Sequence, residues 1–291
     1  MSQIVPFRSA LFVPASNPRA MSKIRDLAAD FVICDLEDAV AGSAKAQARS
    51  ALAQLADSGV FAQRRVVIRI NDPAGDEGRV DLALCASLGP YAVLMAKVEH
   101  GEALTQAGAV LAQGGAPHEV RLWAMIETPR AILDVARIAG AGGRLECLVC
   151  GPNDLGTALR LPPHARRAGL TTALSMMVLA ARANGLQILD GVFNDIEDEA
   201  GFVRECEAGR ALGFDGKTLI HPRQIEPANQ IFGPSETALR EAQAIVAAFE
   251  QAGGDTAVVK VGGKMAERMH LEEARRQLAL AVATGTLAPR G

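Results

Sequence analysis

The sequence predicts an α/β fold, a TIM (β/α)8 barrel with a C-terminal helical extension. Eight apolar runs, each too short to be a helix, recur between residues 8 and 220, and they are continuous rather than alternating. Continuous runs indicate strands buried on both faces, which are typical of parallel sheets with helical crossovers. Amphipathic stretches rich in Ala and Arg separate the runs and favour those crossover helices. Eight such repeats favour a closed barrel.

The predicted strands and helices alternate along the chain. The strands are expected in RSALFVP (8–14), DFVICDL (30–36), RVVIRI (65–70), YAVLMAKV (91–98), VRLWAMIE (120–127), ECLVCG (146–151), QILDG (187–191) and FDGKTLI (214–220). The helices are expected at 18–28, 44–56, 81–88, 102–112, 129–139, 171–184 and 198–212. A doubly wound open sheet is the alternative. It is disfavoured because PASNPRAM (14–21) lacks the Gly-rich fingerprint that usually follows the first strand of such a sheet.

The C-terminal part of the chain has a different pattern. Prolines, Asn and Gly at 222–235 predict a connector, and two helical patterns follow at 236–251 and 266–283. The short apolar run TAVVKVGGKM (256–265) separates them. We therefore expect a catalytic barrel domain over 1–230 and a helical extension over 231–291. The extension is expected to cap the barrel, pair with another subunit, or deliver a residue to an active site.

Composition narrows the class of protein. A hydrophobic content of 49% and a net charge of −3 suit one large α/β domain with a sizeable core. No apolar run reaches 18 residues, and Pro6, Arg8 and Pro14 interrupt the N-terminal stretch where a signal peptide needs continuity. We expect a cytoplasmic enzyme with no membrane partner. With one Trp, one Tyr and no basic stripe, nucleic acid is not an expected partner.

The five cysteines lie mostly in apolar segments, which suits reduced thiols in a cytosolic core. Cys147 and Cys150 have C-x2-C spacing, so a redox or zinc site is the alternative. The pair lies in a predicted strand, where residues three apart point to opposite faces and cannot easily share a ligand. Structural thiols are the favoured interpretation.

The candidate site residues are the polar ones that end the apolar runs, because a TIM barrel has its active site at the C-terminal ends of its strands. A carboxylate buried there needs a cation or a donor beside it. Glu127 and Asp154 follow neighbouring strands and could share a metal. Two carboxylates with water and substrate oxygens form the set that Mg²⁺ prefers, and the five scattered histidines form no zinc motif. The other candidates are Asp35, Glu37, Asp38, Arg69, Asn71, Asp72, Lys97, Glu99 and Asn153.

Each candidate also has a structural interpretation. Glu127 could be a first-turn carboxylate favoured by a helix dipole, and Asp154 could be an N-cap. Arg69 could serve only to pair with the acidic cluster, and Lys97 could be an ordinary salt-bridge lysine. The acidic pair at 37–38 could cap the loop that follows it.

Six segments, taken together, resemble one family. They are RSALFVPASNPRAM, ADFVICDLEDAV, IRIND, AMIETPRAI, CGPNDLG and GFDGKTLIHPRQI. In order and approximate spacing they are similar to the citrate lyase β-subunit and CitE-like group of the HpcH/HpaI aldolase superfamily, over residues 8–230. The resemblance implies a Mg²⁺-dependent carbon–carbon lyase that cleaves or forms a malyl-, citramalyl- or citryl-type thioester. It also implies a keto acid and a CoA or acyl-carrier thioester as partners, and a closed homo-oligomer such as a trimer.

The resemblance also assigns roles. Arg69 would contact the substrate carboxylate or the developing enolate, and Glu127, which would also face the substrate, would bind Mg²⁺ together with Asp154. Glu37 and Asp38 would support the waters of the metal. These roles agree with the chemistry, because cleavage of a β-hydroxy acyl thioester places negative charge on an enolate oxygen that a Lewis acid and a fixed cation stabilise.

A general acid/base is expected from the C-terminal extension. In CoA lyases that the chain resembles, a segment like GKMIDMPH supplies an aspartate, often to the site of a neighbouring subunit. Here the segment reads GKMAERMH (263–270), and Glu267 stands at the position of that aspartate. The alternative is that Glu267 is an ordinary surface residue. The chain departs from its relatives also at Ala15 and Ser16, where they often carry Gly followed by Asn or Asp, and at Ala96, where proline commonly precedes the lysine.

Two further functions stay open from the sequence. One is an aldolase of the HpcH/HpaI type that acts on free keto acids without CoA. The other is a non-catalytic or assembly subunit of a citrate lyase-like complex, in which the altered extension leaves only binding.

Overall fold

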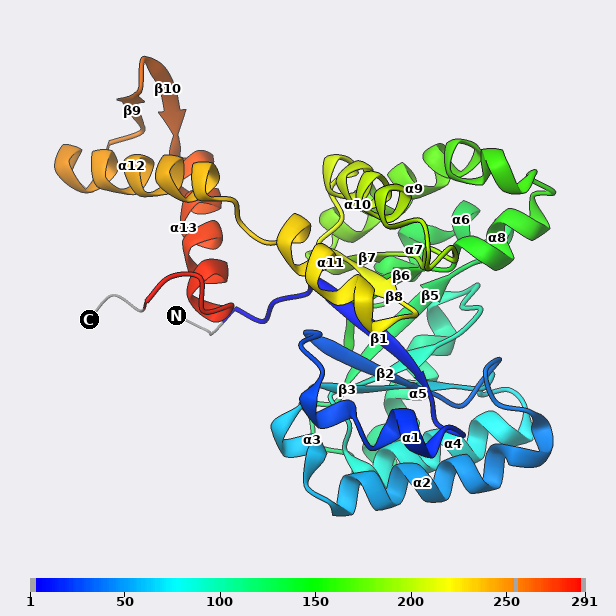
Figure 1. Ribbon diagram of the computed structural model, residues 1–291. Helices are drawn as coiled ribbons and strands as arrows, with labels where there is room; N and C mark the ends of the chain where they lie inside the picture. Colours follow the sequence, from blue (N-terminus) through cyan, green and yellow to red (C-terminus); the bar gives the residue numbers. More distant parts are fainter. Residues whose placement is uncertain (1–3, 254–255, 289–291) are drawn as a thin grey trace.

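The computed structural model describes residues 4–253 and 256–288 and contains the predicted closed barrel (Figure 1). Eight parallel strands pair in chain order, and β1 closes the ring by pairing with both β2 and β8. The strands are β1 (Ser9–Pro14), β2 (Phe31–Asp35), β3 (Val66–Ile70), β4 (Ala92–Met95), β5 (Arg121–Ile126), β6 (Leu145–Cys150), β7 (Gln187–Asp190) and β8 (Gly216–Leu219). The predicted fold class is confirmed.

Helices and short 3-10 turns (η) connect the strands and cover the outside of the barrel. They are α1 (Pro18–Met21), η1 (Ile24–Asp26), η2 (Gly42–Ala44), α2 (Lys45–Asp57), α3 (Val60–Gln63), α4 (Asp76–Leu88), α5 (Gly101–Gln113), α6 (Pro129–Leu133), α7 (Val135–Ala139), α8 (Pro152–Ala158), η3 (Pro163–Ala165), α9 (Arg166–Ala183) and α10 (Glu199–Leu212). No helix in the part of the chain that the structure describes is both long and apolar enough to cross a membrane.

The strands are buried on both faces, as their continuous apolar runs predict. Alternate residues join two different clusters, one inside the barrel and one between the strands and the helices. Inside, Phe31 and Trp123 pack edge to face with ring centroids 4.9 Å apart. Cys147 belongs to the inner cluster and Cys150 to the outer one, so they point to opposite faces, and both thiols are free and buried. The interpretation as structural thiols agrees with this placement.

One buried ionic network fixes the last two strands of the barrel. Lys217 of β8 has no exposed surface, and its ammonium lies 3.0 Å from Asp190 of β7 and 2.7 Å from Glu205 of α10. Arg167 of α9 adds a second cation at 2.7 Å from Asp190. These cations hold the pKa of Asp190 below its ordinary value despite the burial that would raise it. Asp190 also accepts the N–H of Gly191, which fixes the loop after β7.

The segment 222–235, predicted to be a connector, contains helical structure that the sequence pattern did not predict. It comprises η4 (Pro222–Gln224) and α11 (Ile225–Phe232). The prolines favoured a loop, but Pro222 and Pro227 lie in the first turns of η4 and α11, where no intrahelical N–H bond is lost. The prediction of an irregular connector was therefore wrong over these residues.

The extension consists of α12 (Glu236–Ala252), the antiparallel hairpin β9 (Val258–Val261) and β10 (Lys264–Glu267), and α13 (Arg268–Ala283). The apolar run TAVVKVGGKM thus forms most of a hairpin. Gly262 and Gly263 both have positive φ, 54° and 82°, as a tight two-residue hairpin turn requires. Figure 1 shows α12, the hairpin and α13 standing to one side of the barrel. The helical pattern expected from residue 266 begins at Arg268 instead.

Candidate active site

A pocket of about 500 Å³ lies at the C-terminal ends of the strands, where the sequence predicts the site. Its lining includes Asp38, Arg69, Glu127 and Asp154, four of the six predicted site residues. The fifth, Glu37, is buried beside the pocket and contacts Arg69. The structure therefore brings together five residues that come from four different strand ends.

Arg69 stands at the centre of the charge network. Its guanidinium makes a two-point ion pair with Asp35, with Nε 2.7 Å from Oδ1 and Nη2 2.5 Å from Oδ2. Nη1 lies 3.0 Å from Glu37 Oε2, and the group sits 5.0 Å from the centroid of the Phe12 ring. The pKa of Arg69 is raised because these carboxylates outweigh the burial that opposes its charge. Arg69 is thus a permanently charged group that lines the pocket. Its Nε and Nη2 atoms pair with Asp35, and Nη1 pairs with Glu37.

Asp35 is a strand-end candidate to which the sequence assigned no specific role. Besides Arg69, it accepts the N–H groups of Glu37, at 2.9 Å, and of Ala39, at 3.2 Å. Asp35 therefore shapes the loop after β2. Glu37 contributes as well, because its Oε2 accepts the backbone N–H of Asp38 at 3.2 Å, so its loop-capping role is present beside its ion pairs. The available signal for Asp35 was its position as the last residue of a fully buried strand.

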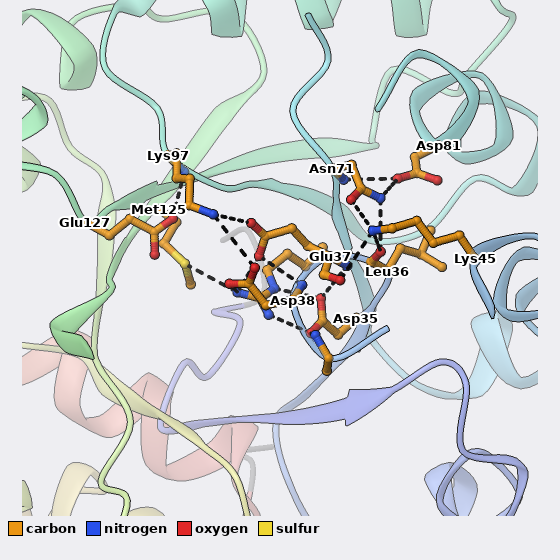
Figure 2. Close-up of polar contacts among 12 residues, drawn as sticks. Asp35, Leu36, Glu37, Asp38, Lys45, Asn71, Asp81, Lys97, Met125 and Glu127 are labelled. Carbon is orange, nitrogen blue, oxygen red and sulfur yellow. Dashed lines mark hydrogen bonds and ion pairs between the residues drawn. The ribbon is translucent and has the colours of Figure 1, made fainter. Parts of the chain in front are cut away.

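Glu37 is held from two sides by cations. Lys97 Nζ donates to Oε1 at 2.7 Å (Figure 2). Arg69 Nη1 contacts Oε2. Burial nevertheless raises the pKa of Glu37 above its ordinary value, with the two cations opposing that shift. Asp38 is more exposed, and its carboxylate lies 3.8 Å from Lys97 Nζ and 4.0 Å from Arg69 Nη1.

A second set of contacts supports the acidic loop from behind. Asn71, at the end of β3, donates to the carbonyl of Leu36 at 3.0 Å and to Asp81 at 2.6 Å. The ammonium of Lys45 donates to the same carbonyl at 3.0 Å and to the Asn71 side chain. Asn71, a strand-end candidate in the sequence, is therefore part of the support for the loop (Figure 2).

Glu127 is deeply buried in the pocket wall, with 3% of its surface exposed. The backbone N–H of Lys97 donates to Oε1 at 2.8 Å. Helix α6 begins after Thr128, whose hydroxyl caps it, so Glu127 precedes the helix. The alternative that Glu127 is only a first-turn carboxylate of this helix is therefore wrong. Burial, together with the nearby charges of Asp154 and Glu37, raises its pKa to about 8.

Asp154 lies in the first turn of α8, which begins at Pro152 after the N-cap Gly151. Asp154 is therefore not the N-cap of the structural alternative. Gly151 lets β6 approach Glu127 closely, because a Cβ at this position would lie 2.4 Å from both Cβ and Oε2 of Glu127. Gly151 leaves room for the Glu127 carboxylate, and the Lys97 N–H binds it. Glu127 and Asp154 both line the pocket.

The two carboxylates fit a hard divalent cation. A buried acid that lacks a paired cation is costly to ionise, and the raised pKa of Glu127 records that cost. Glu127 and Asp154 offer only oxygen donors, as Mg²⁺ prefers. Across residues 4–253 and 256–288, no three His, Cys, Asp or Glu side chains converge into a ready-made metal cluster. A cation at this pair would therefore complete its coordination with water or substrate oxygens.

Glu267 does not line this pocket. It is the last residue of β10 and the N-cap of α13, where its side chain accepts the backbone N–H of His270 and its own N–H donates to His270 Nδ1 at 3.0 Å. The hairpin that carries it lies away from the barrel of the same chain (Figure 1). A catalytic role for Glu267 thus requires the site of another copy.

Comparison with known proteins gives consistent matches. A family model described as HpcH/HpaI aldolase/citrate lyase matches residues 8–222, and one described as a C-C bond lyase of the TIM-barrel fold matches residues 168–286. A (3S)-malyl-CoA thioesterase of Cereibacter sphaeroides is 43% identical over 97% of this chain and 96% of its own length. The citrate lyase subunit beta of Escherichia coli is 31% identical over 96% of this chain and 94% of its own length.

Among solved structures, the CitE protein of Mycobacterium tuberculosis in complex with magnesium, acetoacetate and coenzyme A is similar throughout. Its TM-score is 0.74 at 30% identity, with 94% of this chain and 97% of that chain covered. Because 94% of this chain is covered, the match extends over the barrel and into the extension.

Proposed function

The chain belongs to the HpcH/HpaI aldolase/citrate lyase family of lyase-type enzymes, and on this premise we propose that it is a Mg²⁺-dependent lyase acting on a β-hydroxy acyl thioester of the malyl-, citramalyl- or citryl-CoA type. The observation that carries the proposal is the buried carboxylate of Glu127, which shares the pocket with Asp154 and with the fixed cation Arg69. The CitE structure with magnesium, acetoacetate and coenzyme A supports the choice of metal and of substrate class.

Each of these residues is assigned one role in the proposed reaction. Glu127 and Asp154 would hold Mg²⁺, which when bound supplies a Lewis acid for substrate oxygens. Arg69, held in place by Asp35 and Glu37, would bind the substrate carboxylate and stabilise negative charge on the enolate oxygen. In the cleavage direction, the β-hydroxyl loses its proton, the adjacent C–C bond breaks, and its electron pair passes to the thioester enolate while the hydroxyl carbon becomes the keto acid. The enolate is then protonated to give the acyl thioester.

The proton acceptor is proposed to be Glu267 from a neighbouring copy. This proposal rests on the position of Glu267 in a hairpin away from its own pocket, and on the resemblance of GKMAERMH to the tail of CoA lyases. It requires a homo-oligomer, proposed as a trimer. Size-exclusion chromatography with light scattering measures the assembly state, and a monomer at working concentration would exclude this role.

The metal assignment is tested by calorimetric titration of Mg²⁺ with oxaloacetate or glyoxylate. Wild type is expected to bind, and the Glu127→Ala, Asp154→Ala double variant is expected not to. The matched control replaces two first-turn acids that lie outside the pocket lining, Glu102→Ala with Glu199→Ala, and should bind as wild type does. Unchanged binding by the Glu127→Ala, Asp154→Ala protein would remove the metal site from the proposal.

Thioester hydrolysis is the second candidate function, because (3S)-malyl-CoA thioesterases match nearly the whole chain at 42–43% identity. In that reaction water adds to the thioester carbonyl, the C–S bond breaks, and the thiolate leaves as the free thiol. A malyl-type CoA thioester separates the two reactions. A lyase releases a keto acid and keeps the thioester bond, whereas a thioesterase releases free thiol and a hydroxy acid. Hydrolysis of acetyl-CoA alone must be measured in parallel. This control detects a two-step route in which lyase cleavage is followed by hydrolysis of the acyl thioester that it releases.

The two remaining alternatives are distinguished by the carbon nucleophile that condenses with glyoxylate. Condensation of glyoxylate with acetyl-CoA supports the thioester lyase, and condensation with pyruvate supports an aldolase on free keto acids. Failure of both condensations and of thioester hydrolysis, with Mg²⁺ binding retained, would leave a binding or assembly subunit.

A further inference from the structure

Lys97 has an unusual backbone conformation at the edge of the pocket. Its φ is 52°, and apart from Arg160 it is the sole non-glycine residue with positive φ in the part of the chain that the structure describes. The left-handed region costs free energy for a side chain with a Cβ, and lysine, unlike Asn or Asp, has no local hydrogen bond that offsets this cost. Such strain is retained only where surrounding contacts impose it.

The contacts that impose it converge on Glu127. Lys97 lies two residues beyond the end of β4, and its N–H points at Glu127 Oε1, 2.8 Å away. The N–H of the next residue, Val98, donates to the carbonyl of Met125 in β5 at 3.3 Å. The segment after β4 is therefore tied to β5 on one side of Lys97, while the Lys97 N–H serves the buried carboxylate.

The side chain of the same residue reaches the other acids of the site. Its ammonium lies 2.7 Å from Glu37 Oε1, and Arg69 holds the second oxygen of that carboxylate. The Lys97 side chain is about half exposed, at 49%, so its ion pair is partly screened by water. The backbone contact is not screened in this way, because Glu127 is almost fully buried.

We propose that Lys97 is a positioning residue whose strained backbone N–H holds the Glu127 carboxylate in its metal-binding orientation. The inference rests on the proposed function, in which Glu127 is a Mg²⁺ ligand. In this proposal the backbone and the side chain of Lys97 have different roles. The N–H sets the affinity of Glu127 for the metal, and the ammonium pairs with Glu37. An ordinary salt-bridge lysine would need only the second of these.

The test compares substitutions that all remove the ammonium but differ in backbone preference. Lys97→Gly and Lys97→Asn accept positive φ, Lys97→Val resists it, and Lys97→Pro lacks the N–H. In calorimetric titration, Lys97→Val and Lys97→Pro are expected to bind Mg²⁺ about ten-fold more weakly than Lys97→Gly, which corresponds to about 1.4 kcal/mol. At saturating Mg²⁺ the kcat of Lys97→Val should approach that of Lys97→Gly, so the defect appears in the KM for Mg²⁺.

Arg160 provides the matched control, with φ 56° at the end of α8 and outside the pocket lining. Arg160→Val and Arg160→Gly should bind Mg²⁺ equally, although the valine variant carries the same kind of strain. The proposal would be overturned if the valine and glycine variants differed in Mg²⁺ affinity by the same factor at Lys97 as at Arg160.

A measurement without metal keeps this inference distinct from the proposed function. The difference in Tm between Lys97→Gly and Lys97→Val should shrink when Glu127→Ala is added to both, because the carboxylate that imposes the strain is then gone. Should wild type bind no Mg²⁺ while this coupling persists, the metal assignment fails and the positioning role stands. Absence of the coupling together with equal Mg²⁺ affinities refutes the positioning role.

Discussion

The guanidinium of Arg69 and the carboxylate of Asp35 form a two-point ion pair, with contacts of 2.7 and 2.5 Å, at the centre of the pocket wall. Both side chains are nearly buried, at 12% and 2% exposure, so neither charge can be satisfied by water alone. The pair fixes Arg69 in the pocket wall, where Nη1 contacts Glu37, and it links the ends of β2 and β3.

Loss of Asp35 is expected to destabilise the protein strongly. Removing one partner of a buried pair leaves an uncompensated charge, so Asp35→Ala should lower the free energy of unfolding by about 3 kcal/mol in urea titrations. The Asp35→Ala, Arg69→Met double variant should lose less than the sum of the two single losses. Asp76→Ala, which removes an exposed partner of Arg79, is the control and should have no measurable effect. Additive losses in the double variant would show that the pair is not coupled.

The stability of the metal-free protein should depend on the ionisation of Glu127. Its pKa is raised by burial from 4.5 to about 8, so the native state binds this proton more tightly than the unfolded state does. The resulting contribution to stability is fully present below pH 4.5 and is lost as the pH rises to about 8. Glu127→Gln, which keeps an acceptor for the Lys97 N–H, should therefore be the more stable protein at pH 8, by on the order of 3 kcal/mol.

Calorimetric unfolding at pH 5 and pH 8 measures this difference. At pH 5 the difference in stability should be much smaller, because Glu127 is still protonated in the native state there. Added Mg²⁺ should stabilise wild type at pH 8 and leave Glu127→Gln almost unchanged, since ligand binding stabilises only the protein that binds. A stability difference that stays constant with pH would contradict the predicted ionisation.

Gly151 should be essential for the geometry of Glu127. In Gly151→Ala the new Cβ would lie 2.4 Å from Glu127, so the carboxylate or β6 must shift. Overpacking of this kind costs about 1–3 kcal/mol, and if that cost falls on the metal-binding orientation of Glu127 the affinity for Mg²⁺ should be about five-fold weaker or more. Gly42→Ala is the matched control, because nothing lies within 4 Å of its added Cβ. Equal Mg²⁺ titrations of the two variants would show that the close approach at Gly151 has no consequence for the site.

Glu267→Gln should reduce turnover by roughly 10²-fold or more while Mg²⁺ binding is retained, as expected for loss of a general acid/base. The amide can still accept the N–H that caps α13, so the fold of the extension should persist. Mixed oligomers of Glu267→Gln and Glu127→Ala subunits test the proposed contribution between copies. Activity recovered on mixing supports it, whereas turnover that persists in Glu267→Gln alone shows that the extension merely packs.

The barrel could be predicted from the sequence because its determinants are local. Continuous apolar runs such as FVICD and the amphipathic stretches between them specify strands buried on both faces and crossover helices, and the strand-end rule then places Glu127 and Asp154 at one end of the barrel. The errors arose where local signals have two meanings. The prolines of η4 and α11 favoured a connector, although a proline in a first turn is compatible with a helix.

The sequence by itself thus determined the fold class and the end of the barrel at which the acids gather, because strand periodicity and strand-end positions depend on residues near one another in the chain. Only the tertiary structure decided which charges meet: that Asp35 binds Arg69, that the N–H of Lys97 turns toward Glu127, and that Glu267 lies away from its own pocket. These relationships join segments that are distant in sequence. They depend on side-chain packing and backbone strain, and no pattern along the chain records either.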